Sequence, residues 1–386
     1  MQIQQYLPLI VIVYFIAIST LLIKTSRQTI DNQPGRDAYI DGLRGIAAIA
    51  VVATHFWRLG ESGISYSFEF SNREAYGSLG VQIFFCITGL LFFSKIYGDS
   101  RSIDWTKFYA ARFRRLVPAY TVFFFLSLAV LLIVGNWSDF KSSQLYNIGN
   151  MAYMGFKGNG RGVFALGIEL DRVFAAIWTL AFEVRFYLVF PFIVWVSMTK
   201  VGDKLLLPLG AALVWYEIAS TGSCIAGYFL VGAVAAKHFR KVKCSPALLI
   251  ACYAVIAITL YLSITMKLSP FGWERFALSS AMFISLAVSK PALLATRPMT
   301  ALGDMSYSLY LLHAPLLLLV SHMMKMVVGP GAPSTAQYML VVLAGVVVMF
   351  VVSLYSYRFV ELPFLRKNTA SSQSRGAESI PRGQEA

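Results

Sequence analysis

Apolar runs of membrane-spanning length recur along this chain from near its beginning almost to its end. A helix of about 17 to 25 residues crosses the roughly 30 Å hydrocarbon core of a bilayer, where all backbone polar groups must be satisfied internally. Of the 386 residues, 57% are hydrophobic and 13% are charged, and a mean hydropathy of +0.64 lies far above that of soluble domains. We therefore expect an all-α, polytopic membrane protein.

The apolar segments predict about 11 crossings, of which the two around Gly222 are short. The first segment lacks a basic leader and a small-residue cleavage site, so we expect it to be retained as a helix. The expected helices lie at residues 6–23, 40–57, 79–95, 116–135, 174–199, 204–220, 222–236, 246–266, 275–290, 301–324 and 337–357.

Basic residues between these helices predict the orientation. With the N-terminus outside and the C-terminus cytoplasmic, the cytoplasmic segments hold 22 of the 33 lysines and arginines and the outer ones hold nine, as the positive-inside rule requires. The same distribution accounts for the net charge of +14 without a nucleic-acid partner. The four cysteines form no CxxC pair, so we expect neither a disulfide framework nor a metal site.

The helix expected at residues 40–57, within "YIDGLRGIAAIAVVATHFWR", carries three ionisable side chains. Arg44 and His55 are eleven residues apart, which returns them to nearly the same helix face roughly 16 Å apart along the axis. Asp41 precedes Arg44 by three residues and can pair with it. A lone membrane histidine commonly serves an interhelical hydrogen bond, but three ionisable groups on one short helix favour a functional surface.

A basic cluster occurs in "AARFRRLVPAY", where Arg112, Arg114 and Arg115 precede a proline at the start of an apolar run. Such a cluster can anchor a helix end to anionic lipid headgroups. Alternatively, Arg112 and Arg115 can clamp the phosphates of an anionic donor at the cytoplasmic mouth of the bundle. The sequence leaves both interpretations open.

The stretch "WTLAFEVRFYLVFPFI" places Glu183 and Arg185 inside an apolar run. If the run enters from outside, Glu183 lies roughly 13 Å below the outer boundary, about one helical turn deeper than His55. A carboxylate at that depth needs a partner, and we expect His55 or an arginine. A purely structural ion pair is the alternative.

In "LGDMSYSLYLLHAPLLLL", Ser306, Tyr310 and His313 are spaced by four and three residues, so they share one stripe of a helix. This stripe predicts either a polar seam between helices or a surface that contacts substrate. His238 and His322 are not part of such a stripe and are given no role.

Taken together, these stretches resemble acyltransferase family 3, bacterial membrane enzymes that O-acylate surface sugars and some secreted small molecules. The family's hallmark, an arginine and a histidine with ten residues between them, is present as "DGLRGIAAIAVVATH". "FFCITGLLFF" resembles the FFxxSG element with Thr88 in the serine position. "RFRRLVP", "WTLAFEVRFYLVFP", "SYSLYLLHAP" and "YRFVELPF" resemble later motifs in the same order, from about Tyr39 to Lys367.

The resemblance implies transfer of an acyl group, most often acetyl, from cytoplasmic acyl-CoA to a sugar hydroxyl in the bacterial inner membrane. Acetyl-CoA is then a co-substrate, and no bound cofactor is expected. His55 is the expected general base, because an imidazole titrates near neutral pH. Glu183 is expected to orient His55 or to bind the acceptor hydroxyls, with neutralisation of an arginine as the alternative, and Asp41 is the third expected catalytic residue. The other expected site residues are Arg44, Arg112 and Arg115 for the donor and Ser306, Tyr310 and His313 for the substrate.

The chain is expected to divide into an extra N-terminal helix with a basic loop (1–38), the acyltransferase membrane domain (39–367) and a disordered cytoplasmic tail (368–386). Some family members carry an SGNH-type extracytoplasmic domain after the membrane part, and none is expected here. Any second transfer step would then be done by this chain or by a partner.

A proton-coupled transporter or lipid-linked sugar flippase would also need buried Arg, Glu and His residues. The sequence shows no repeated pair of broken helices, which favours an enzyme over a transporter. The acceptor is left open among O-antigen, exopolysaccharide, lipo-chitooligosaccharide and small-molecule hydroxyls, lipid-linked or not. The expected outer segment 136–173 contains aromatic residues that can stack on sugar rings or cap the interface, namely Trp137, Tyr146, Tyr153 and Phe156.

Overall fold

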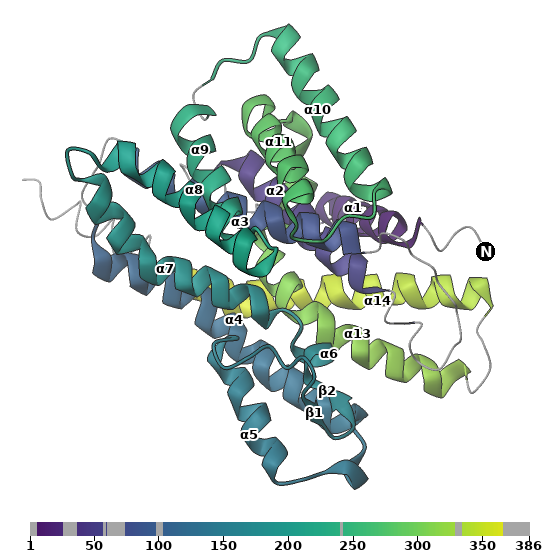
Figure 1. Cartoon of the computed structure of the whole chain (residues 1–386). Coiled ribbons are helices and arrows are strands. Elements are labelled where there is room, and N and C mark those ends of the chain that lie inside the picture. The colour runs from purple at the N-terminus through teal and green to yellow at the C-terminus, as the bar shows by residue number, and fades with distance from the viewer. Residues whose placement is uncertain are drawn as a thin grey trace, which may run out of the picture.

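The computed structural model describes residues 6–25, 37–56, 59, 74–97, 103–239, 242–328 and 334–365, which form a bundle of helices with one small β-hairpin (Figure 1). The expected tail at 368–386 lies outside the described residues. The helices are α1 (Leu7–Thr25), α2 (Ala38–His55), α3 (Glu74–Ile96), α4 (Trp105–Val134), α5 (Ser143–Asn150), α6 (Leu170–Phe174), α7 (Ile177–Ser197), α8 (Gly202–Thr221), α9 (Ile225–Val234), α10 (Pro246–Thr265), α11 (Trp273–Ser289), α12 (Arg297–Asp304), α13 (Ser306–Val328) and α14 (Thr335–Ser356).

The structure confirms an all-α protein, and each expected apolar segment is helical. Within the described ranges, six helices are long and apolar enough to cross a membrane, as a multi-pass membrane protein requires. The count of 11 crossings and the orientation stay predictions. The six spans are α3, α4, α7, α10, α13 and α14 with its extension to Leu365.

Two helix boundaries differ from the sequence prediction. α4 begins at Trp105 rather than at residue 116, because the Asp104 carboxylate caps it by accepting a hydrogen bond of 3.0 Å from Lys107 N. The basic cluster therefore lies inside a helix, not ahead of one. The helix expected at 301–324 is broken at Met305, between α12 and α13, where α2 packs so closely that a Cβ on Gly303 would lie 2.0 Å from Asp41 O.

α2 is the centre of the bundle and packs against α1, α3, α12 and α13. Most of its residues are buried, in agreement with an apolar helix surrounded by protein. α3 in turn packs against α9, where a Cβ on Gly89 would lie 2.2 Å from Phe229 O. Small residues thus let the backbones approach closely, as is common between membrane helices.

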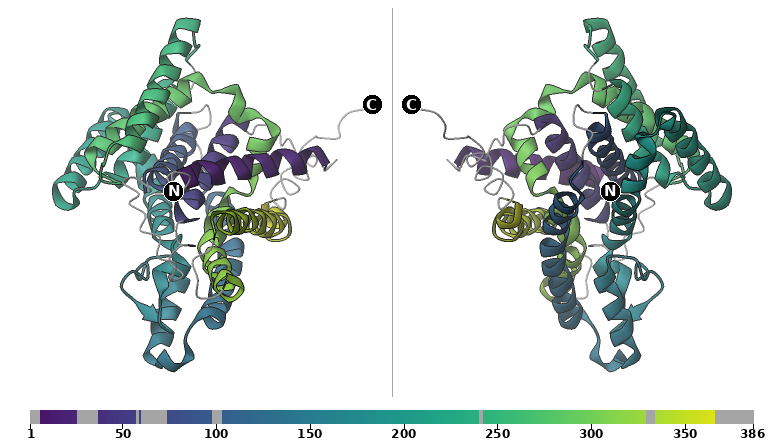
Figure 2. Two further views of the ribbon diagram at one scale, coloured as in Figure 1. Left: turned by 90° about the vertical axis from the view of Figure 1, so that its right-hand side faces the viewer. Right: turned by 90° about the vertical axis from the view of Figure 1, so that its left-hand side faces the viewer.

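Residues 136–173 form a lobe at the end of α4, made of short helices and the hairpin of β1 (Phe164–Ala165) and β2 (Ile168–Glu169) (Figures 1 and 2). Leu166 and Gly167 both have positive φ, 51° and 76°, as a two-residue type I′ turn requires. Asn136 N donates a 2.8 Å hydrogen bond to Leu166 O, which ties the hairpin to the end of α4. The aromatic side chains singled out in this segment are all exposed: Trp137, Tyr146, Tyr153 and Phe156.

Candidate active site

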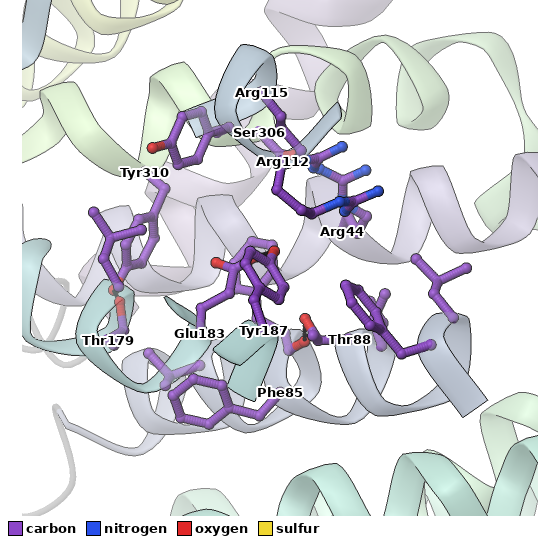
Figure 3. Close-up of a pocket in the computed structure, with 17 residues that line it drawn as sticks. Arg44, Phe85, Thr88, Arg112, Arg115, Thr179, Glu183, Tyr187, Ser306 and Tyr310 are labelled. Atoms are coloured by element: carbon purple, nitrogen blue, oxygen red, sulfur yellow. Dashed lines mark hydrogen bonds between the residues drawn. The ribbon is translucent and has the colours of Figure 1, made fainter. Parts of the chain in front are cut away.

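A cavity opens between α2, α3, α4, α7 and α13 and is referred to as the arginine cavity (Figure 3). It encloses about 780 Å³ not filled by protein atoms, part of which is open to the outside. Its lining is largely apolar and aromatic. The charged lining residues are Arg44, Arg112, Arg115 and Glu183, so the structure brings the expected donor-binding residues together with the expected buried carboxylate.

Arg44 is held at one wall of the arginine cavity by two polar contacts. Its Nη1 lies 3.8 Å from Asp41 Oδ1, which confirms the pairing expected from their spacing. Its Nη2 donates to Ser306 Oγ at 3.4 Å, and Ser306 Oγ donates in turn to Gly303 O at 2.7 Å. Asp41 and Ser306 therefore orient the guanidinium of Arg44 from α2 and α13.

Arg112 is held by aromatic rings rather than by a carboxylate. Its guanidinium carbon lies 5.2 Å from the ring centroid of Phe92, 5.7 Å from that of Tyr187 and 5.9 Å from that of Phe108, distances suited to cation–π attraction. Its Nε is buried without a hydrogen-bond partner among the described residues. Part of its donor capacity is thus left for a ligand.

The guanidinium groups of Arg44 and Arg112 lie close to Arg115 on one side of the cavity (Figure 3). Among the described residues, neither Arg112 nor Arg115 forms an ion pair within 4.0 Å. One carboxylate, Glu183, faces these three cations in the lining. Arg44 has Asp41 as its partner, so the guanidinium groups of Arg112 and Arg115 are the charges that favour an anionic ligand.

Glu183 lies on the face of α7 that also carries Thr179 and Tyr187, each four residues away. The hydroxyl of Tyr187 donates to Glu183 Oε1, so a phenol replaces His55 or an arginine as the partner expected from sequence. The neighbouring Arg185 guanidinium points elsewhere and lies 5.5 Å from the ring centroid of Phe156 in the lobe. Glu183 is thus oriented toward the cavity without being neutralised by an arginine.

His55 and His313 face each other across α2 and α13, with ring centroids 4.7 Å apart. His55 Nδ1 lies 2.8 Å from Val51 O, and His313 Nδ1 lies 2.6 Å from Tyr310 O. A carbonyl oxygen can only accept, so each Nδ1 donates, and in the neutral ring the lone pair is on Nε2. Both rings therefore present Nε2 as the basic atom.

Tyr310 connects the histidine pair with the arginine cavity. Its side chain lines the cavity, its hydroxyl lies 2.7 Å from Thr179 Oγ1, and its ring centroid lies 5.9 Å from that of His313. Neither His55 nor His313 belongs to the cavity lining. The expected site is thus divided into a cation-lined cavity and a histidine pair one contact away from it.

Three contributors to this site were not singled out from the sequence. Phe92 stacks on Tyr187 at 5.1 Å, and both hold Arg112. Glu361, buried beyond the end of α14, accepts a 3.1 Å hydrogen bond from Ser308 N in α13. The sequence could have indicated Glu361, because it is a glutamate inside the apolar run "YRFVELPF". Nothing in the sequence indicates that Phe92 contacts Arg112.

The acyltransferase domain family matches residues 37–358, which include the whole cavity lining and both histidines. This match covers most of the chain. The chain therefore belongs to acyltransferase family 3, and it is an enzyme of the acyltransferase class.

Several known proteins are similar to most of this chain. The peptidoglycan O-acetyltransferase OatA of Listeria monocytogenes is 26% identical over 376 residues, covering 85% of this chain and 56% of the relative. The O-acetyltransferase OatA of Staphylococcus aureus (strain NCTC 8325 / PS 47) is 24% identical over 373 residues, covering 85% and 58%. The putative peptidoglycan O-acetyltransferase YrhL of Bacillus subtilis is 26% identical over 384 residues, covering 87% and 56%.

The chain thus spans little more than half the length of these relatives. No solved structure matches it.

Proposed function

We propose that the protein is a membrane O-acetyltransferase that moves an acetyl group from cytoplasmic acetyl-CoA to a hydroxyl of a cell-surface or secreted glycan. The family supports acyl transfer, and the similar proteins are named as O-acetyltransferases, two of them of peptidoglycan. The observation that carries the proposal is the cation-lined cavity with a pair of basic imidazoles one contact away.

The arginine cavity suits the donor. Acyl-CoA carries several phosphate charges at one end and an uncharged thioester at the other. Arg44, Arg112 and Arg115 offer guanidinium groups to phosphates, a geometry that binds them in pairs of hydrogen bonds. The aromatic and apolar remainder of the lining suits the pantetheine arm and the thioester.

The histidine pair suits the acceptor. In this proposal His55 Nε2 removes the proton of the glycan hydroxyl as the hydroxyl oxygen bonds to the acyl carbon. The carbon–sulfur bond breaks, and the proton returns from the imidazole to the departing thiolate, which yields free coenzyme A. Such base catalysis contributes an acceleration of about 10² to 10⁴.

The remaining residues support these two parts of the site. Asp41 and Ser306 hold Arg44, and Tyr187 holds Glu183 where its carboxylate can accept hydrogen bonds from the acceptor's hydroxyls. Tyr310 and His313 connect the thioester end of the cavity with His55. A covalent acyl-His55 intermediate satisfies the same contacts, and the two routes differ in whether acyl transfer to the enzyme precedes acceptor binding.

The test is transfer of labelled acetyl from acetyl-CoA to glycan in membrane vesicles that carry the intact protein, His55→Ala or His238→Ala at equal amounts. His238 is exposed and distant in sequence from the site, so it is a matched control. We expect transfer by the intact protein and the control, and its loss with His55→Ala. Equal transfer by all three would remove His55 from the chemistry, and no transfer with any donor and glycan would favour the transporter.

A further inference from the structure

A second cavity lies where the lobe meets α13, and it is referred to as the lobe cavity. It encloses about 800 Å³ not filled by protein atoms, including its open mouth. Its polar lining is mainly charged and comes from the lobe and from the C-terminal half of α13: Glu169, Arg172, His322 and Lys325. Neither the family resemblance nor the proposed chemistry assigns it a role.

The lobe cavity and the arginine cavity lie at opposite ends of α4. Arg112 lines the arginine cavity and Val134, at the last residue of α4, lines the lobe cavity. The 22 residues between these positions span about 33 Å of helix, which is close to the roughly 30 Å thickness of a hydrocarbon core. If α4 crosses the membrane, the two cavities open toward its two sides.

α13 lines both cavities and carries one member of the histidine pair, His313, between them. Ser306 and Tyr310 line the arginine cavity, His313 contacts His55, and His322 lines the lobe cavity. From Tyr310 to His322 the helix rises about 18 Å. His322 follows His313 by nine residues, so it lies about 14 Å further along α13 and on the opposite face of that helix. A glycan anchored in the lobe cavity must therefore extend along α13 and around it to place a hydroxyl at His55.

The charge of the lobe cavity favours an anionic ligand. Arg172 and Lys325 are cationic, and His322 lies three residues from Lys325 on the same face of α13. The lining holds one carboxylate, Glu169, whose Oε1 accepts a 2.7 Å hydrogen bond from Gly162 N, and its charge offsets one of the two cations. Phe164, 56% exposed, adds an aromatic face of the kind that stacks on a sugar ring.

The hairpin wall of this cavity is fixed before any ligand arrives. Its type I′ turn is tied at both polar groups of Leu166: the carbonyl accepts from Asn136 N at 2.8 Å, and the amide donates to Gln144 Oε1 at 3.3 Å. A wall held in this way loses little conformational freedom when a ligand binds. The lobe cavity is thus a preorganised site rather than a gap between mobile loops.

We propose that the lobe cavity binds the acidic group, a carboxylate or a phosphate, of the acceptor glycan, so that the enzyme selects anionic acceptors. This inference rests on the proposed function, because it names the substrate class of the same transfer. Lys325 and Arg172 bind the anion, His322 supplies a further donor, and Phe164 packs against the adjoining sugar.

The test is binding of soluble sugar probes to the purified protein in neutral-lipid nanodiscs. One pair of probes is an oligosaccharide with a free carboxylate and its amide, and another is a sugar phosphate and its unphosphorylated form. We expect tighter binding of an acidic probe, with a loss of about tenfold or more in Lys325→Gln and Arg172→Gln, the scale of a charged hydrogen bond. Lys141→Gln, an exposed lysine of the same lobe outside the cavity, is the matched control.

A preference for only one acidic probe over its neutral form supports the inference and identifies the anion. Equal binding of both acidic probes and their neutral forms overturns it, and so does an equal loss with Lys141→Gln. Turnover of acetyl-CoA is measured in parallel with the acidic and the neutral form of each probe as acceptor. If turnover persists but the acidic probes bind no more tightly than the neutral ones, this inference alone is refuted. If the acidic probes bind more tightly but no acceptor is acetylated, the proposed acetyl transfer is refuted and the anion site remains.

Discussion

The imidazoles of His55 and His313 lie in contact, with ring centroids 4.7 Å apart, although one belongs to the second helix and the other to the thirteenth. Each ring donates from Nδ1 to a carbonyl one turn or less earlier in its own helix, which fixes the ring and leaves Nε2 as the base. The partly buried His55 thus has a second, buried imidazole beside it that can accept or return a proton.

Replacing each histidine in turn is expected to separate their roles. His55→Ala should lower the transfer rate by about 10² to 10⁴, the usual contribution of a general base. His313→Ala should lower the rate less, because His55 Nδ1 keeps its bond to Val51 O without it. Steady-state rates at saturating acetyl-CoA measure both effects. A larger loss with His313→Ala would reverse the two assignments.

Removing the hydrogen bond between Tyr310 and Thr179 is expected to slow catalysis without weakening donor binding. The two hydroxyls lie 2.7 Å apart and are buried, so Tyr310→Phe leaves Thr179 Oγ1 with one partner fewer, at a cost of about 1 to 3 kcal/mol. The double variant Tyr310→Phe/Thr179→Val should be no worse than either single variant. The kcat and KM of all three, with their thermal stability, measure this, and additive losses would mean that the pair does not act as a unit.

Arg112→Lys is expected to raise the KM for acetyl-CoA about tenfold, with a smaller change in kcat. An ammonium retains the charge but loses the planar contact with Phe92 and Tyr187 and the paired hydrogen bonds to phosphate. Arg114→Lys is the control, because Arg114 lies in the same cluster but does not line the cavity. Equal effects of both changes on KM would point to lipid headgroups rather than the donor.

Gly89→Ala is expected to damage folding more than chemistry. Its Cβ would lie 2.2 Å from Phe229 O in the backbone of α9, so α3 and α9 would have to separate, at about 1 to 3 kcal/mol. Gly149→Ala in α5 meets nothing within 4 Å and should be neutral. Folded yield and unfolding temperature in detergent measure the difference, and similar values for the two variants would contradict the observed packing.

The sequence alone predicted those features that depend on spacing along one helix. The pairing of Asp41 with Arg44, and the shared location of Arg112 and Arg115, both follow from a separation of three residues. The early start of α4 was also signalled, by Asp104 at its cap, but a search for apolar runs passes over the polar first turns of a helix.

Features that depend on packing between helices could not be predicted in the same way. The contact of His55 with His313 requires α2 to lie against α13, and periodicity says nothing about which helices are neighbours. Glu183 was expected to pair with a charged group, yet Tyr187, one turn later in α7, provides the partner. His322 was given no role from the sequence, although Lys325 lies three residues later on the same face of α13, because the other polar residues of the lobe cavity come from the lobe.

The lobe is a self-contained insertion whose chain leaves the bundle at the end of α4 and returns at the start of α7. Its last helix, α6, is anchored by the fully buried Leu170, Val173 and Phe174, while its tip and hairpin contribute no residue to the arginine cavity. Donor handling and the acceptor choice proposed for the lobe cavity can therefore diverge independently. Residues 136–173 supply Phe164, Glu169 and Arg172 to that cavity, and they can change between relatives while the residues proposed to hold the thioester are inherited unchanged.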